Sequence, residues 1–311
     1  MRNTKIIELR CKGLCARVDP TNGATCTELY DAQNGIRVLY PSENPFINGI
    51  PILFPANRIA GGRFCAGGHT YTLPINEEKT GCALHGTMNA LPFETVSREE
   101  SRAWCKRDFC NDYPGFPQSF RVDLIYELTE NALHQTLRVK NRSPLPLPLL
   151  FGFHTTFAVP FCQGSSVQDI RIMADVDRVI ERGSDNLPTH VKEICDDYSR
   201  ALQRGEAPLT RDISRHYRAG TRGETALLDT RTGVLIRYET DPAFRYRMIF
   251  TANHEQYLCM EPQICAVNAP NAPLDEEYTH VPLLSQNETA EFRSVISILK
   301  ADSSNKSFFV E

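Results

Sequence analysis

The chain has 311 residues, of which 41% are hydrophobic and 23% charged, with a formal net charge of -4 and a pI near 6.1. These values are ordinary for a globular protein and exclude disordered and collagen-like chains. The slight acidity, with no block of basic residues, argues against a surface for nucleic acid or an anionic membrane. We therefore expect the ligand to be a small molecule.

The length allows two average domains or one large β domain. No internal repeat, low-complexity stretch or obvious linker divides the sequence, which favours a single domain over residues 1–311. The sequence shows no secretory signal pattern and no run near the roughly 20 apolar residues of a membrane span. We expect a cytoplasmic protein, either a monomer or a homodimer.

Eleven cysteines are scattered along the chain, an odd number without the CxxC pairs of zinc or redox sites. We expect unpaired thiols that pack as small buried hydrophobes, rather than a disulfide framework.

Short strands separated by turns are expected at the start of the chain. Strand-like segments cover Ile7–Leu9, Cys15–Val18 and Thr25–Tyr30. Asn34-Gly35 predicts a hairpin turn, because type I′ turns need positive φ at both central residues.

Residues 49–86, GIPILFPANRIAGGRFCAGGHTYTLPINEEKTGCALHG, combine strands with polar turns. An apolar run at 50–54 is stopped by Pro55. Two glycine pairs bracket short strands at 63–65 and 70–73, which predicts a hairpin.

Three polar residues of this segment stand on turns just beyond strands: Asn57, Arg58 and His85. Such residues project into a cleft, where they offer donors to a hydroxyl-rich ligand and one group that titrates near neutral pH. The plainer interpretations are a surface ion pair for the arginine and a satisfied loop residue for the histidine.

The middle and the end of the chain also read as strands. Short strands are expected within residues 91–112. The clearest hairpin lies between Ser119 and Arg142, and three prolines after it favour an extended chain into His154. One helix is predicted between Glu193 and Gly205. Further strands are predicted in a hairpin over 227–240, at 257–260 and at 292–299.

Glu261 follows an apolar strand-like run directly and precedes Pro262, which predicts a carboxylate at the rim of a sheet. A surface acid at a strand end is the alternative. If Glu261 and His154 face one cleft, they form an acid and base pair that burial can tune toward neutral pH. Such a pair suits the opening of a cyclic hemiacetal.

Four motifs occur in order along most of the chain: NRI at 57–59, LHG at 84–86, GFH at 152–154, and MEP at 260–262 with VNAPN after it. Together with GIPILFPANRIAGGRF and YTLPINE, this order resembles the aldose 1-epimerases, the galactose mutarotase-like family, in a divergent bacterial-type branch. The resemblance implies an all-β fold, a large antiparallel two-layer β-sandwich with one or two short helices. That fold agrees with the strand pattern.

The resemblance also implies roles for single residues. Glu261 matches the general base that takes the proton of the C1 hydroxyl, and His154 matches the acid that protonates the ring oxygen. Arg58 and His85 match residues that bind sugar oxygens, with Asn57 beside them. The ring opens and recloses to the other anomer by proton transfer alone, so neither a metal nor an organic cofactor is implied.

Two positions depart from the best-known members. Phe153 stands where they carry an asparagine before the acid histidine. The resemblance implies a substrate-contacting aspartate in the segment TRDISRHYRAG. Asp212 is the nearest aspartate, and the alternative is that Arg215 or His216 occupies the position itself. The preferred sugar therefore stays open.

The resemblance favours an isomerase of carbohydrate metabolism that acts on a free aldose. A hexose-6-phosphate mutarotase would need clustered arginines, for which Arg58, Arg63 and Arg215 are the candidates. A non-catalytic sugar-binding protein would not need the pair of His154 and Glu261. A glycosidase normally uses two carboxylates instead of one carboxylate and one histidine.

Overall fold

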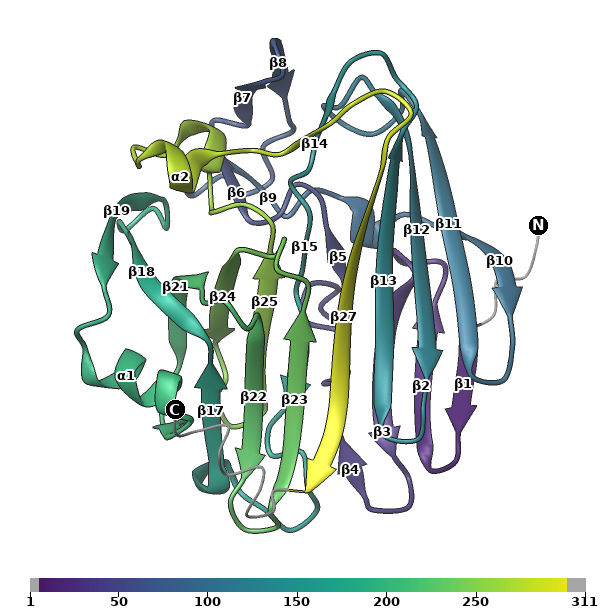
Figure 1. Ribbon diagram of the computed structural model, residues 1–311, viewed down its shortest axis with the longest axis vertical. Helices are drawn as coiled ribbons and strands as arrows, with labels where there is room; N and C mark the ends of the chain where they lie inside the picture. The colour runs from purple at the N-terminus through teal and green to yellow at the C-terminus, as the bar shows by residue number, and fades with distance from the viewer. Residues whose placement is uncertain (1–5, 301–311) are drawn as a thin grey trace.

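The computed structural model describes residues 6–300. Two large antiparallel β-sheets form the two layers of a sandwich, with the nine-stranded sheet across the front of Figure 1. Two short helices, α1 (Asp197–Arg204) and α2 (Glu276–Thr279), lie at the margin of the sheets. The predicted all-β antiparallel sandwich is confirmed.

The first layer, the nine-stranded sheet, contains the hairpin between Ser119 and Arg142 that the sequence predicts most clearly. Phe120, Leu124 and Leu128 alternate with more polar residues along one strand and are buried, as their period of two predicts. In spatial order the nine strands are β10 (Glu94–Arg98), β11 (Arg102–Cys110), β12 (Ser119–Leu128), β13 (Ala132–Asn141), β27 (Thr289–Lys300), β23 (Val234–Thr240), β22 (Glu224–Asp229), β17 (Ile170–Ala174) and β20 (Ala207–Pro208).

The second layer has eight strands and is assembled from segments that are far apart in the chain. Its spatial order is β19 (Pro188–Glu193), β18 (Val176–Arg182), β21 (Ile213–Ala219), β24 (Tyr246–Thr251), β25 (Tyr257–Gln263), β15 (Gly152–Phe153) and β5 (Ile52–Leu53), with β16 (Thr156–Ala158) also paired to β25.

Smaller sheets and single turns of 3-10 helix complete the fold. The hairpin of β7 (Arg63–Ala66) and β8 (His69–Thr72) projects at the top of Figure 1, beside α2. The small sheets contain β1 (Ile7–Cys11), β2 (Leu14–Asp19), β3 (Thr25–Asp31) and β4 (Ile36–Arg37); β6 (Arg58–Ala60) and β9 (Cys82–Leu84); β7 (Arg63–Ala66) and β8 (His69–Thr72); and β14 (Leu147–Pro148) and β26 (Leu283–Leu284). The 3-10 turns are Met88–Ala90, Val167–Asp169 and Ala269–Asn271.

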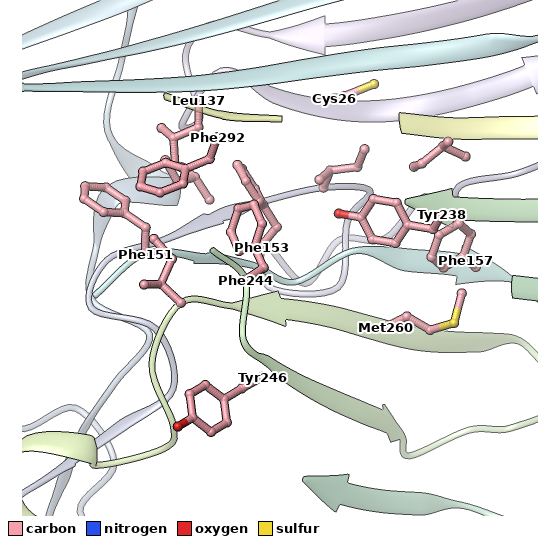
Figure 2. Packing of buried hydrophobic residues seen from close by; sticks show 14 of the residues in the cluster. Cys26, Leu137, Phe151, Phe153, Phe157, Tyr238, Phe244, Tyr246, Met260 and Phe292 are labelled. Carbon is pink, nitrogen blue, oxygen red and sulfur yellow. The ribbon is translucent and has the colours of Figure 1, made fainter. Parts of the chain in front are cut away.

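Aromatic side chains fill the space between the two layers (Figure 2). The rings of Phe157 and Tyr238, one from each sheet, lie 5.8 Å apart between centroids. Phe244 contacts Phe153 at 6.0 Å and Phe292 at 5.8 Å. Buried aromatic side chains contribute strongly to core energetics, so these contacts help to hold the two layers together.

The predicted helix is confirmed and its ends have local causes. The side chain of Asp196 accepts a hydrogen bond from the N–H of Ser199, which caps the first turn. Gly205 ends the helix in the left-handed conformation at φ 70°.

Two strand predictions need correction. β25 does not end at Glu261 but continues to Gln263, between β24 and β15, so Glu261 lies inside a central strand and not at the rim of the sheet. Residues 91–112 contain β11, a nine-residue strand, instead of short strands alone. Pairing on both sides overrode the proline that suggested an end.

The cysteines are unpaired, as expected, but not all of them are buried. Six are buried, two are partly exposed, and Cys65, Cys110 and Cys195 are exposed. Over residues 6–300, no helix has the length and apolar character needed to cross a membrane.

Truncation of the β12 core face should destabilise the fold strongly. Leu124 is fully buried, so we expect Leu124→Ala to lower the free energy of unfolding by about 2–5 kcal/mol. Urea titration followed by circular dichroism measures this change. Val96→Ala, at an exposed position of β10, is the control. An equal loss in both variants would contradict the assignment of Leu124 to the core.

Candidate active site

The candidate site lies on the face of the eight-stranded sheet that points away from the aromatic core. Side chains alternate between the two faces along a strand. Met260 of β25 points into the core in Figure 2, so Glu261, the next residue, points to the opposite face. Tyr246 of the neighbouring strand also lies on that outer side of the sheet (Figure 2).

Strand register brings His154 beside Glu261. The residues two positions before and after His154 pair with Gln263 and Cys259 of β25. Glu261 stands midway between those two partners, so the side chains of His154 and Glu261 are direct neighbours on one face.

His154 and Glu261 form a buried contact. Nε2 of His154 lies 3.3 Å from Oε1 of Glu261, and the two side chains are 6% and 2% exposed. Gln263 donates a hydrogen bond from Nε2 to the other carboxyl oxygen at 3.1 Å. Within the described part of the chain, Nδ1 of His154 has no hydrogen-bond partner.

Burial moves the pKa values of this pair toward the neutral forms. Desolvation raises the pKa of Glu261 to about 8, and it lowers the pKa of His154 to about 4. Between these two values the pair holds one proton, which the order of the pKa values places on Glu261. The pair can therefore accept a proton at one position and give one at the other.

Asn57 and His85 hold each other in left-handed backbone conformations, with φ of 58° and 60°. The N–H of His85 donates to the carbonyl oxygen of Asn57 at 2.9 Å, and the N–H of Asn57 donates to Nδ1 of His85 at 3.3 Å. Burial holds the pKa of His85 well below its ordinary value. The ring is therefore neutral with its proton on Nε2, which makes Nε2 a donor.

Gly86 explains the LHG motif on steric grounds. Its φ is +63°, and a Cβ at this position would lie 1.8 Å from the carbonyl oxygen of Phe54. A side chain here would push the turn away from the strand below it. The close approach of Gly86 to Phe54 thus fixes the position of His85, the residue before it.

Arg58 is held by a two-point ion pair. Its Nε and Nη2 donate to the two carboxyl oxygens of Glu77 at 2.7 and 2.6 Å. The hydrogen bonds from Arg58 lower the pKa of Glu77. This geometry fixes the guanidinium plane. Nη1 donates one hydrogen bond to Oδ1 of Asn57 at 3.4 Å, and its second N–H remains for a ligand.

The VNAPN motif positions the strand that carries Arg58. The N–H of Asn268 donates to the carbonyl oxygen of Arg58 at 2.9 Å, and its Oδ1 accepts from the N–H of Ala60 at 3.0 Å. The motif therefore positions Arg58 by hydrogen bonds to the backbone of β6.

Five of the residues expected from the sequence line one cavity of about 270 Å³: Asn57, Arg58, His85, His154 and Glu261. Its other walls combine amide, hydroxyl and apolar groups with one more arginine. They are Asn44, Phe46, Ile47, Leu84, Arg182, Asn186, Ser214, Met248 and Phe250.

Asp212 lies elsewhere, and its position does not match the expected contact with the ligand. It is exposed, and its Oδ1 accepts a hydrogen bond from the N–H of His254 at 3.0 Å. Of the two other residues considered for that role, Arg215 binds Asp196 at 2.8 Å, and His216 is buried in β21. None of the three lines the cavity.

Arg182, Ser214 and Phe250 were missed by the sequence analysis. They lie on β18, β21 and β24, which are consecutive strands of the sheet, and β24 pairs with β25. Glu77 was also missed, although it ends the YTLPINE motif and a carboxylate partner for Arg58 was the plainer interpretation.

A larger cavity of about 750 Å³ lies among Lys12, Asp31, Glu130 and other residues. Its acidic groups are engaged, since Glu130 binds Lys12 at 2.6 Å and Asp31 accepts N–H groups of its own turn. It offers no buried acid and base in contact. The chemistry therefore points to the smaller cavity.

The sandwich with this polar cavity on one sheet defines the galactose mutarotase-like class of fold. The sequence model of the family described as aldose 1-epimerase matches residues 5–298, and the chain belongs to this family.

The chain is also similar to solved structures and to one curated relative. A galactose mutarotase-like protein of Clostridium acetobutylicum superimposes with a TM-score of 0.85 at 27% identity, over 96% of both chains. The galactose 1-epimerase of Lactobacillus acidophilus shares the fold, with a TM-score of 0.73 at 16% identity over 97% of both chains. The uncharacterised protein YphB of Escherichia coli K12 is 25% identical over 72% of this chain and 75% of its own.

The buried carboxyl of Glu261 should cost stability as the pH rises. Its pKa of about 8 in the folded protein exceeds the ordinary 4.5, so the folded state keeps a proton that the unfolded state releases. Stability should therefore fall between about pH 5 and 8. We expect Glu261→Gln to raise Tm by several degrees at pH 8 and by less at pH 5.

Thermal melts of both proteins at the two pH values measure this difference. Glu78→Gln, at an exposed acid of the same loop as Glu77, is the control. A Tm gain for Glu261→Gln that does not depend on pH would show that Glu261 is ionised throughout the range.

Proposed function

We propose that the protein is an aldose 1-epimerase, an isomerase that interconverts the α and β anomers of an aldose. The observation that carries this proposal is the 3.3 Å contact of His154 Nε2 and Glu261 Oε1 in a polar cavity. The anomeric carbon bears two oxygens, the C1 hydroxyl and the ring oxygen. Because these oxygens share one carbon, an acid and a base in contact can reach both of them.

Ring opening needs one proton removed and one delivered. Glu261 takes the proton of the C1 hydroxyl, while His154 gives a proton to the ring oxygen. The bond between C1 and the ring oxygen breaks, and the electron pair of the hydroxyl forms the C1 carbonyl. Because the pKa order places the single proton of the pair on Glu261, this step starts after that proton has moved across the 3.3 Å contact to His154.

Reclosure restores the pair. Rotation about the C1–C2 bond turns the other face of the carbonyl toward the new hydroxyl. That hydroxyl attacks C1, His154 takes its proton, and Glu261 returns a proton to the carbonyl oxygen. Protons and electrons balance over the cycle, since the product differs from the substrate only in configuration at C1.

The rest of the cavity suits a sugar ring. His85 offers Nε2–H and Arg58 offers Nη1 to ring hydroxyls, and the side chain of Asn57 supports Arg58 at 3.4 Å. Phe46 and Phe250 add apolar surface for the C–H face of the ring.

The alternatives fit this geometry less well. The arginines considered for a phosphate do not cluster, since Arg58 binds Glu77, Arg215 binds Asp196, and Arg63 lies exposed on β7. A glycosidase needs two carboxylates, and Glu261 is the one acidic side chain among the residues that line the cavity. A binding protein has no use for an acid and base in contact.

Polarimetry on freshly dissolved α-D-galactose and α-D-glucose tests the proposal. The protein should accelerate the decay to the equilibrium rotation. Glu261→Gln and His154→Ala should each lower the catalysed rate by at least about a hundredfold, because each removes one partner of the proton transfer.

Glu78→Gln serves as the control, since this exposed acid lies outside the cavity. Circular dichroism establishes that each variant is folded. Near wild-type rates in folded Glu261→Gln would remove Glu261 from the role of base.

A further inference from the structure

Arg182 stands at the boundary of two adjoining cavities. The inner cavity, of about 270 Å³, contains His154 and Glu261. An outer cavity of about 390 Å³ lies beside it, and both are lined by Arg182, Asn186 and Ser214. A ligand in the inner cavity can therefore extend past Arg182 into the outer one.

The guanidinium of Arg182 is only partly used by the protein. Its Nη2 donates to the carbonyl oxygen of Ser214 at 2.9 Å and to Oγ of the same residue at 2.8 Å. Among residues 6–300, its Nε and Nη1 have no hydrogen-bond partner and no carboxylate forms an ion pair with it. Burial lowers the pKa of Arg182, because the charge is partly desolvated.

The other charged groups of the two cavities are compensated. The His154 and Glu261 pair is neutral when it holds one proton, and His85 and His216 are kept neutral by burial. The remaining charges form ion pairs: Arg58 with Glu77 at 2.6 Å, Arg215 with Asp196 at 2.8 Å, and Glu181 with Lys192 at 3.1 Å. Arg182 therefore presents a positive charge without an ion-pair partner to the ligand space, and this charge interacts with Glu261 and Glu181 only at longer range.

His216 adds a second unused polar group on the same wall. It is 1% exposed, it lines the outer cavity, and neither ring nitrogen has a hydrogen-bond partner in the described residues. It pairs directly with Met248, which pairs with Glu261, so the two residues share one face of the sheet. A buried imidazole without a partner is costly unless a ligand satisfies it.

We propose that the substrate is an aldose that carries one negative charge, a hexuronate, whose carboxylate binds Arg182 with His216 beside it. This inference rests on the proposed function, since it places C1 of the sugar at His154 and Glu261. One arginine without an ion-pair partner matches a singly charged carboxylate, whereas a phosphate dianion would leave excess negative charge in a partly desolvated site.

Exchange NMR between the anomers at equilibrium tests this specificity. The probes are D-galacturonate, D-galactose and glucose 6-phosphate, each with wild-type protein. We expect kcat/KM for galacturonate to exceed that for galactose at least tenfold. Arg182→Gln should lower this ratio about ten- to a hundredfold, the value of a charge-assisted hydrogen bond.

Arg178→Gln is the matched control. Arg178 lies on the same strand, outside both cavities, and pairs with Glu193 at 3.8 Å. This variant should keep the wild-type ratio of the two sugars.

Three outcomes would overturn the proposal: equal kcat/KM for galacturonate and galactose, an equal loss for both sugars in Arg182→Gln, or faster turnover of glucose 6-phosphate than of galacturonate. If no sugar is turned over, the proposed function fails instead. Calorimetric binding then tests Arg182 separately: tighter binding of galacturonate than of galactose, lost in Arg182→Gln, supports the site, and equal binding contradicts it.

Discussion

The desolvation of one carboxyl and one imidazole in contact is the constraint on which the site depends. Nε2 of His154 and Oε1 of Glu261 lie 3.3 Å apart with almost no exposure to solvent. In water their ordinary pKa values would leave the carboxyl ionised at neutral pH. Burial reverses that order, so the pair retains one proton between about pH 4 and 8.

The fold supplies this environment through strand register. β25 lies in the interior of the eight-stranded sheet, and the side chains on its two faces have different surroundings. Met260 packs into the aromatic core, and Glu261, one residue later, faces the cavity. Asn57 and His85 line the same cavity, and the ring of His85 lies 5.3 Å from that of His154. Gly86 lets the turn after His85 approach Phe54 closely. A rigid core on one side thus fixes an acid and base on the other.

Much of the fold could be predicted because its signals are local: the β12–β13 hairpin from alternating apolar residues, and α1 from its spacing and its terminal glycine. Five site residues could be named because they stand in motifs. Arg182 could not, since its approach to Glu261 depends on the order of β18, β21, β24 and β25 in the sheet, which no local pattern encodes. The continuation of β25 past Pro262 could not be predicted either, because it depends on pairing with β24 and β15.

The central claim is that His154 and Glu261 share one proton at neutral pH. Carbon-13 NMR of the Glu261 side-chain carboxyl, assigned by comparison with Glu261→Gln, measures its protonation directly. The account predicts a titration near pH 8, with a simultaneous shift of the His154 ring nitrogens. A carboxyl that titrates near its ordinary value of 4.5, without any response from His154, would contradict it.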